Sequence, residues 1–315
     1  MAIQHMKTFF ILIFCFFSLV LKAQDEVFLF SYFVDNGQDG LHLAYSNDGL
    51  KWTALNSGKS YLKPMVGKDK LLRDPFILRG KDGLFHMVWT SGWWDRQIGY
   101  ASSPDLIHWS EQKGIPVMDR EPTARNSWAP EMVYDPANKN YIIFWATTIP
   151  GRHTDVASSE QEKGLNHRMY CTKTVDFKSF SPTELFYNPD FSTIDATILA
   201  MNNKFYMFLK NENPNPPEKN IRITVSDQAS GPYPLKVSAP ITGKYWAEGP
   251  TALEVDEQVY VYFDKYMNHQ YGAVRSKNMT DWEDVSDQIS FPEGVRHGTA
   301  FKVSKAIFDA LKKLE

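Results

Sequence analysis

Short runs of alternating apolar and polar residues dominate this chain, and they predict β-strands rather than helices. The runs are rich in β-branched and aromatic residues, and Gly, Asn and Asp separate them as turns. They cover residues 27–34, 41–46, 84–90, 141–148, 205–210 and 259–263. Helical spacing is found near the end of the chain, where Ile307, Leu311 and Leu314 predict a short helix packed on the outside.

Five further segments have the pattern of one strand repeated, each with an ionisable residue near its start. These residues are Asp74, Glu131, Asp195, Glu248 and His297, and successive ones are 57, 64, 53 and 49 residues apart. Spacing this regular is typical of a repeat fold. A second repeated element places an Asp or Asn four residues before an aromatic. It occurs at Asp48, Asp105, Asp176 and Asn278, where we expect the polar side chain to close a turn.

Four strands per unit and five units predict an all-β fold, a five-bladed β-propeller. Residues 71–113, 127–183, 192–238 and 246–286 are each expected to form a complete blade. The fifth blade is split, because residues 27–56 supply three outer strands and residues 296–303 supply one inner strand. Joining the two ends in one sheet closes the ring and removes an exposed edge. A β-sandwich is the alternative, but it does not explain why the two ends complement each other.

The amino-terminal residues predict a signal peptide. Lys7 precedes an apolar run over residues 9–21, and Ala23 follows at a suitable cleavage position. The run is too short to span a bilayer. We therefore expect a signal peptide at residues 1–23, a single catalytic domain at 24–315, and a secreted or periplasmic protein with no membrane contact after cleavage. Cys171 is the one cysteine left, which excludes an internal disulfide. The net charge of −3 and the absence of basic runs argue against nucleic acid as a partner.

The repeat has a chemical consequence if its inner strands line one axis. The four acids and His297 would then face one another at similar depth. Two carboxyls on opposite walls are what glycoside hydrolysis needs, and crowding raises the pKa of at least one of them. A metal site is the chemical competitor. One His and no Cys make zinc a poor fit. No cofactor is required, although a structural Ca²⁺ in the central channel beside His297 stays open.

The motifs around these residues resemble glycoside hydrolase family 43, whose members are five-bladed propeller enzymes acting on arabinose-, xylose- or galactose-containing plant polysaccharides. The resemblance covers the whole mature chain. It is carried in the family's order by Arg73-Asp74-Pro75, Trp128-Ala129-Pro130-Glu131, Thr193-Ile194-Asp195, Glu248-Gly249-Pro250 and Arg296-His297-Gly298. One position departs from the pattern, because the family often has Asp where Glu131 stands. The departure weakens any assignment of substrate by analogy.

The resemblance also implies roles for these residues. Asp74 would be the general base, Glu248 the general acid, and Asp195 would orient Glu248 and tune its pKa. The reaction would invert the anomeric centre, with the carboxyls of Asp74 and Glu248 roughly 6.5–9.5 Å apart to leave room for a water molecule. His297 would lie at the bottom of the funnel and hold water or a cation.

The remaining candidates concern substrate binding. Glu131 could reach a sugar hydroxyl, and Trp93, Trp94, Trp128 and Trp246 could stack on sugar rings or fill space between blades. Arg73 and Arg296 could bind hydroxyls, but we expect them to pair with the crowded acids. The prediction is a secreted, inverting glycosidase that removes terminal sugars, first an α-L-arabinofuranosidase, then a β-xylosidase or exo-galactanase. A non-catalytic carbohydrate-binding propeller is the alternative.

Overall fold

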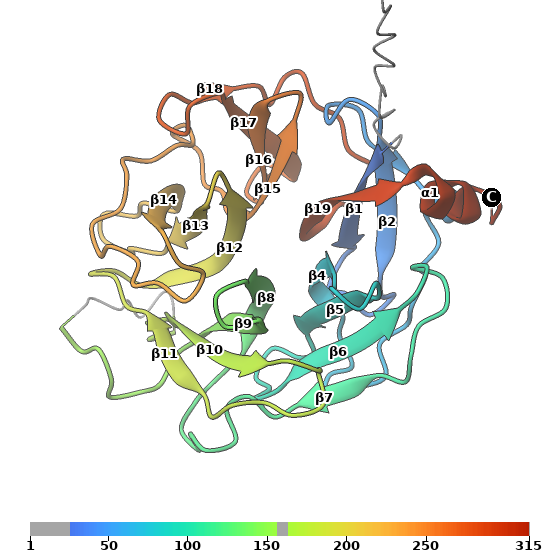
Figure 1. Cartoon of the computed structure of the whole chain (residues 1–315). Helices are drawn as coiled ribbons and strands as arrows, with labels where there is room; N and C mark the ends of the chain where they lie inside the picture. Colours follow the sequence, from blue (N-terminus) through green and yellow to red (C-terminus); the bar gives the residue numbers. More distant parts are fainter. Residues whose placement is uncertain (1–25, 156–162, 315) are drawn as a thin grey trace, which may run out of the picture.

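Five β-sheets surround one central axis in the computed structural model, which describes residues 26–155 and 163–314 (Figure 1). The predicted signal peptide at residues 1–23 lies outside the described residues. The innermost strands are β4, β8, β12, β15 and β19. Each of them contacts the next around the ring, and β15 and β4 both contact β19. The predicted five-bladed β-propeller is confirmed.

Each blade runs from its inner strand outwards. Blade 1 comprises β4 (Arg73–Arg79), β5 (Phe85–Thr90), β6 (Ile98–Ser103) and β7 (Lys113–Ile115). Blade 2 comprises β8 (Trp128–Asp135), β9 (Asn140–Thr147), β10 (Arg168–Thr174) and β11 (Glu184–Tyr187). Blade 3 comprises β12 (Thr193–Met201), β13 (Lys204–Asn211) and β14 (Asn220–Ser226). Blade 4 comprises β15 (Glu248–Val255), β16 (Gln258–Lys265), β17 (Gln270–Ser276) and β18 (Glu283–Asp284).

Blade 5 joins the two ends of the described chain, as the sequence predicts. Its strands are β19 (Arg296–Ser304), β1 (Glu26–Phe33), β2 (His42–Ser46) and β3 (Thr53–Ala54), in that order from the axis outwards. The register of β1 on β19 runs from Glu26 opposite Ser304 to Phe33 opposite Arg296. A short 3-10 turn, η1 (Asn56–Gly58), follows β3. The ring is therefore closed by antiparallel pairing, which leaves no open edge at the joint.

Blade 3 differs from the prediction, because residues 192–238 form three strands and not four. The segment that would be the outer strand makes two backbone-to-backbone hydrogen bonds to β14, from Ser238 N to Ile223 O and from Ile241 N to Ile221 O. It also contains Pro232, Pro234 and Pro240. Proline has no N–H to donate to a ladder, so this segment follows the sheet without forming a regular strand.

The predicted turn chemistry is confirmed at four outer hairpins. A side-chain oxygen accepts hydrogen bonds from the backbone N–H groups two and three residues further on. This holds for Asp48, Asp105, Asp176 and Asn278, with N–O distances between 2.8 and 3.0 Å. The aromatic that follows is anchored as well, since Trp52 Nε1 donates to Gly49 O and Trp109 Nε1 donates to Leu106 O.

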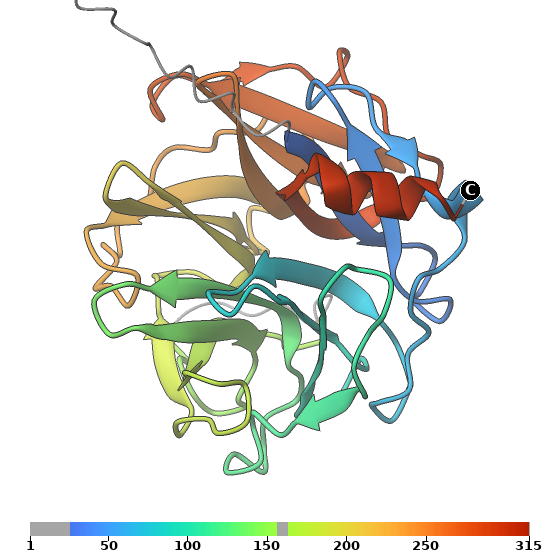
Figure 2. The same cartoon turned by 45° about the vertical axis from the view of Figure 1, so that its right-hand side comes forward.

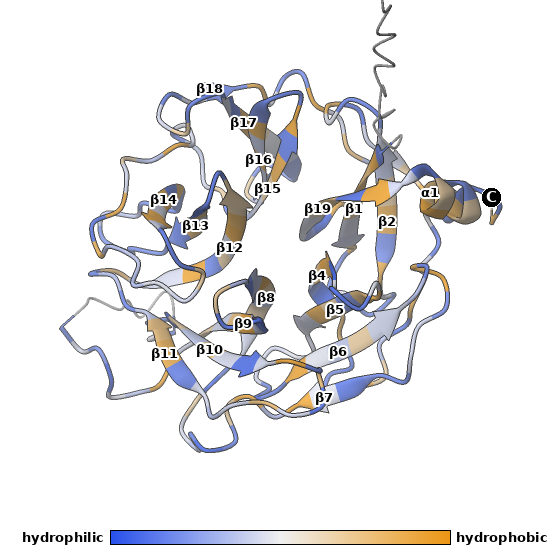
Figure 3. Ribbon diagram, in the orientation of Figure 1, coloured by the Kyte–Doolittle hydropathy of each residue, from blue (hydrophilic) through white to orange (hydrophobic). Residues whose placement is uncertain are grey.

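The core consists of apolar clusters packed between neighbouring blades. Trp89, Trp145 and Phe208 are among the largest side chains that are fully buried. Figure 3 shows orange positions mainly on the strands and hydrophilic colouring over most connecting segments. Helix α1 (Lys305–Lys312) lies on the outside of blade 5 (Figure 2). It buries Leu311, whereas Leu314 is exposed and lies beyond the helix, contrary to the sequence prediction. No helix in the described ranges is long and apolar enough to cross a bilayer.

Gly298 provides a test of the ring closure. A Cβ atom added there would lie 1.7 Å from the carbonyl oxygen of Ser31 on β1, which is backbone and cannot rotate away. We expect Gly298→Ala to lower the free energy of unfolding by about 3 kcal/mol or more, because overpacking forces strand separation. Chemical denaturation measures this. Lys302→Ala, at an exposed position of the same strand, should change stability by less than about 0.5 kcal/mol. Equal stability of the two variants would contradict the prediction.

Candidate active site

Each inner strand carries a β-bulge near its start, and the ionisable residues lie on these bulges. In β4, Arg73 pairs with Thr90 but Phe76 pairs with Val88, so one extra residue is accommodated. The same shift, with the extra residue on the inner strand, occurs in β8, β12, β15 and β19. Such a bulge bends a strand locally and changes the direction of its side chains.

The bulges also determine which positions are equivalent. The equivalent position is occupied by Asp74, Ala129, Asp195, Gly249 and His297. The first four have left-handed φ angles of 52°, 45°, 53° and 59°, which Asp tolerates better than most residues. Glu248 lies one residue before this position, and Glu131 lies two residues after it. The prediction of one common depth for all five ionisable residues is therefore wrong.

Asp74 is held in its ionised form. Its Oδ2 accepts a hydrogen bond from Thr90 Oγ1 at 2.7 Å, and its Oδ1 lies 3.4 Å from His297 Nδ1. Burial raises the pKa of Asp74, but the contact with His297, the charge of Arg73 and the Thr90 hydroxyl bring it below the ordinary value. Burial in turn lowers the pKa of His297, but Asp74, Asp195 and Glu131 raise it to about 9. The two groups form a buried ion pair.

Asp195 connects two blades at the site. Its Oδ2 accepts a hydrogen bond of 3.1 Å from the backbone N–H of Gly249, the residue after Glu248. Burial raises its pKa to about 6; the charge of Glu248 acts in the same direction, whereas His297 and Lys210 oppose it. This carboxyl is thus fixed to the strand that carries Glu248, and it adds negative charge beside that residue.

Glu248 is held by two cations. Lys210 Nζ lies 2.9 Å from its Oε2 and Arg296 Nη2 lies 3.4 Å from its Oε1. Arg296 also donates from Nε to Asp264 Oδ2 at 2.6 Å, which confirms the expected pairing of Arg296 with the acids. The side chain of Glu248 is 22% exposed, against 3% for that of Lys210. Glu248 therefore combines a fixed position with access from solvent.

Lys210 belongs to a buried charge network behind Glu248. Its Nζ contacts Glu212 Oε1 at 2.5 Å, and Glu212 also contacts Lys219. Burial raises the pKa of Glu212, but the two lysines lower it to about 2. Burial likewise lowers the pKa of Lys210, but Glu212 and Glu248 raise it well above its ordinary value. Both charges are therefore present, and the network sets the position of the Lys210 ammonium.

Glu131 is more completely buried than Asp74, and its pKa is shifted in the opposite direction. Its side chain is buried, and Oε2 has no hydrogen-bond partner in the described parts of the chain. Burial raises its pKa to about 8, with smaller contributions from the charges of Asp195 and Asp74, while Thr197 and His297 oppose the shift. Glu131 is thus neutral near pH 7, which does not fit a role as base. The predicted contact with a sugar hydroxyl stays a prediction.

The pKa of Glu131 has a consequence for stability. An acid whose pKa is raised from 4.5 to about 8 keeps a proton that the unfolded chain loses, so its cost grows from pH 4.5 to 8. We expect Glu131→Gln to increase the free energy of unfolding by about 3 kcal/mol near pH 7 and very little near pH 4. Denaturation curves of both proteins across this range measure the difference.

Asp74→Asn is the internal control, because the pKa of Asp74 is lowered on folding. An acid of this kind stabilises the protein above its unfolded pKa, and that contribution is lost as the pH falls through the folded pKa. Asp74→Asn should therefore destabilise the protein at pH 7. A gain from Glu131→Gln that does not change with pH would show that Glu131 is ionised in the folded protein.

Three of the four predicted tryptophans form one wall. The rings of Trp93 and Trp94 each lie 5.7 Å from that of Trp128, whose Nε1 donates to Trp93 O at 2.7 Å. Trp93 and Trp94 are 38% and 48% exposed, so their faces are available to a ligand. Trp246 is separate and lies 6.0 Å from the ring of Tyr266, over which the Lys210 ammonium sits at 4.6 Å.

Arg73 lies between this wall and the acid cluster. Its guanidinium lies 4.3 Å from the ring of Trp93 and 4.6 Å from that of Phe33, and it donates to Asn36 Oδ1 at 3.0 Å. Within the described residues no ion pair joins it directly to an acid, because Asn36 and the two rings take its contacts, so the expected direct pairing is wrong. Its charge still acts on the cluster and helps to lower the pKa of Asp74.

The geometry does not favour a metal at His297. Across residues 26–155 and 163–314, no group of three or more His, Cys, Asp or Glu side chains is arranged to hold a metal ion. The imidazole is protonated and faces Asp74, and a protonated ring nitrogen is not a metal ligand. Calcium in the channel stays a prediction, and no step below passes through a metal.

Several residues of the site are not predicted by the sequence motifs. Thr90, Lys210 and Asp264 come from second strands of their blades, and Asn36 comes from a loop. Lys210 and Asp264 carry a weak signal, because each interrupts an apolar strand one residue before its end. Thr90 shows no such signal, since it ends its strand like many other polar residues.

Comparison with known proteins agrees with this geometry. Residues 25–309 match the profile of a family-43-related group described as a probable glycosyl hydrolase domain. An α-L-arabinofuranosidase from Bifidobacterium longum subsp. longum is 25% identical over 185 residues, which is 53% of this chain and 17% of that protein. This chain thus spans less than a fifth of that relative's length.

Solved structures show the same fold at low identity. The α-L-arabinofuranosidase from Lactobacillus brevis matches with a TM-score of 0.52 and 18% identity, over 68% of this chain and 72% of that chain. A family-43 β-1,3-galactosidase solved with galactodeoxynojirimycin matches with a TM-score of 0.53 and 13% identity, over 71% and 79% of the two chains. Because the family profile covers nearly the whole chain, this protein belongs to the glycoside hydrolase family 43-related proteins.

Proposed function

We propose that this protein is an inverting glycoside hydrolase that removes terminal sugars from plant polysaccharides or oligosaccharides. The observation that carries the proposal is a pair of acids whose surroundings differ. Asp74 is kept ionised by His297 and Thr90, while Glu248 is partly exposed and set by Lys210 and Arg296. One carboxylate to activate water and one carboxyl to protonate the leaving oxygen are what inversion requires.

The remaining residues fit supporting parts in this reaction. Asp195 accepts a hydrogen bond from the N–H of Gly249 and thereby fixes the start of the strand that carries Glu248. The ion pair with His297 favours the ionised form of Asp74 that must accept a proton from water. The wall of Trp93, Trp94 and Trp128 offers aromatic faces on which a sugar ring can stack.

Arabinose is the first candidate for the terminal sugar. Two relatives are named α-L-arabinofuranosidases and one is named a β-1,3-galactosidase. These names suggest an order of testing: aryl α-L-arabinofuranoside, then aryl β-D-xyloside, then aryl β-D-galactoside. An extracellular or periplasmic location, with export through residues 1–23, suits a polymeric substrate and is part of the proposal.

Turnover of this aryl glycoside panel tests the proposal, and ¹H NMR of the first product tests the stereochemistry. We expect hydrolysis of at least one substrate, with the newly formed sugar first appearing as the anomer opposite to that of the substrate. Retention would remove Asp74 from the role of base. Binding of oligosaccharides without turnover of any substrate would favour the alternative, a carbohydrate-binding propeller that has kept the fold.

A further inference from the structure

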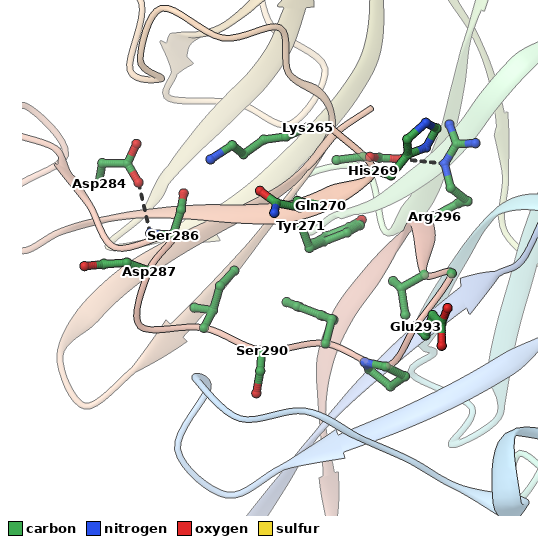
Figure 4. Close-up of a pocket in the computed structure, with 16 residues that line it drawn as sticks. Lys265, His269, Gln270, Tyr271, Asp284, Ser286, Asp287, Ser290, Glu293 and Arg296 are labelled. Carbon is green, nitrogen blue, oxygen red and sulfur yellow. Dashed lines mark hydrogen bonds and ion pairs between the residues drawn. The ribbon is translucent and has the colours of Figure 1, made fainter. Parts of the chain in front are cut away.

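A groove of about 930 Å³ has Arg296, a contact of the proposed catalytic acid, in its lining (Figure 4). One wall is formed by the end of β16 and the start of β17, with Lys265, His269 and Gln270, and the other by the segment 284–296 that leads from β18 to β19. Its volume lies within the range of about 300–1,000 Å³ that is common for ligand sites. Apart from Arg296 and Asp264, the lining residues have no part in the proposed reaction.

Glu248 does not itself line the groove, but two lining residues, Arg296 and Asp264, lie next to it. Arg296 contacts both Asp264 and Glu248. Asp264 is also the residue opposite Glu248 in the pairing of β15 with β16. The inner end of the groove is therefore one residue away from Glu248. In an inverting hydrolase the acid lies on the side of the leaving group, so the groove lies where the leaving part of a substrate must go.

The length of the chain connections explains why the groove is open. The second and third strands are joined by residues 148–167 in blade 2 and 212–219 in blade 3, but by the four residues 266–269 in blade 4. The short turn leaves space beside it for a ligand. A pocket that held only one terminal sugar would not need to extend outwards in this way. The open side is thus on the blade that carries Glu248.

The lining indicates the chemistry of its ligand. Four acids and two cations line the groove: Asp264, Asp284, Asp287, Glu293, Lys265 and Arg296. Asp264 is paired with Arg296, so a negative excess remains that disfavours uronate groups. Gln270 and Ser290 offer hydrogen bonds, and Tyr271 and Phe291, which pack on each other with ring centroids 4.5 Å apart, add apolar surface to the lining. Sugars present both hydroxyls and C–H faces, which matches this combination.

We propose that this groove binds the leaving part of the substrate, as a neutral oligosaccharide of two or more sugars attached to the terminal sugar that is removed. This rests on the proposed hydrolase function and adds a substrate class to it. Cleavage then transfers a proton from Glu248 to the glycosidic oxygen, while water adds to the anomeric carbon and loses its proton to Asp74. The neutral oligosaccharide leaves through the groove.

Filling the groove tests the proposal. Ser290 is an exposed lining residue, and Ser290→Trp should lower kcat/KM for a neutral tetrasaccharide about 10-fold or more, while turnover of the aryl glycoside of the same terminal sugar changes less than about twofold. Thr280→Trp, in the turn at the other end of β17, is the matched control and should change neither rate. Equal effects of Ser290→Trp on both substrates, or none on the tetrasaccharide, would overturn the proposal.

Calorimetry separates this proposal from the hydrolase proposal. Arabinotetraose, or the xylose or galactose tetramer that the aryl panel selects, is titrated into Asp74→Asn and Asp74→Asn/Ser290→Trp, which should bind it without hydrolysis. We expect Ser290→Trp to weaken binding about 10-fold, and a uronate-bearing tetramer to bind Asp74→Asn more weakly than the neutral one. If the wild type hydrolyses nothing, the hydrolase function fails, but these affinities still decide the groove. Equal affinity with and without Ser290→Trp rejects it.

Discussion

Glu248→Gln should remove most activity towards natural glycosides but spare substrates with a very acidic leaving group. Glutamine cannot donate the proton that a poor leaving group needs, so kcat/KM for an oligosaccharide should fall about 10²–10⁴-fold. Dinitrophenolate is stable enough to leave as the anion without being protonated, so the rate on a dinitrophenyl glycoside should be nearly unchanged. Glutamine keeps the size of Glu248 and can still accept the hydrogen bond from Lys210. The comparison of leaving groups therefore reports on the proton and not on the fold.

Asp74→Asn should behave differently, because it removes the base that activates water. Attack by water is required whatever the leaving group, so the rate should fall by about 10²–10⁴-fold on both kinds of substrate. Asp227→Asn, at an exposed acid paired with Lys204, controls for the loss of an acid and should leave both rates unchanged. If Glu248→Gln lost activity equally on both substrates, its role would be structural. If it retained full activity on oligosaccharides, it would not be the acid.

Much of the fold can be predicted from the sequence because it depends on patterns of period two and on a repeat. The alternation of apolar and polar residues marks the strands, and the repeated start of the inner strand marks the blades. The complementary ends of the chain, residues 27–56 and 296–303, predict the joint in blade 5. Blade 3 is the exception, because Pro232, Pro234 and Pro240 lack the N–H groups that a regular fourth strand needs.

The site is less accessible to the same reasoning, because it depends on backbone details that composition does not encode. The motifs identify Asp74, Asp195 and Glu248, but a bulge in each inner strand changes which positions are equivalent. Glu131 aligns with the other acids in the sequence pattern and yet lies deeper, where burial keeps it neutral. Contacts between different strands, such as Thr90 with Asp74 within blade 1 or Lys210 with Glu248 between blades 3 and 4, carry no sequence signature of their own.

Lys210 should matter for catalysis as a positioning residue, although it need not touch the substrate. Its ammonium is buried and contacts Glu248 at 2.9 Å and Glu212 at 2.5 Å. Lys210→Met removes one of the two cations that hold Glu248, so we expect kcat for an oligosaccharide to fall about 10²-fold with a smaller change in KM. Turnover of a dinitrophenyl glycoside, which needs no proton from Glu248, should fall much less. A purely structural change would lower both rates alike.

Lys219→Met is the matched control for this prediction, since Lys219 is also buried and contacts Glu212. Breaking a buried ion pair costs about 3–5 kcal/mol, so both variants should lose similar stability in denaturation experiments. Lys219→Met keeps the contact between Lys210 and Glu248, however, and its rates on both substrates should stay close to those of the wild type. The double variant Lys210→Met/Glu212→Gln removes both members of the inner pair and should recover part of the stability, but not kcat. Equal losses of the two rates in Lys210→Met, or a selective loss on the oligosaccharide in Lys219→Met, would mean that Lys210 supports the fold alone, because global stability does not distinguish the two leaving groups.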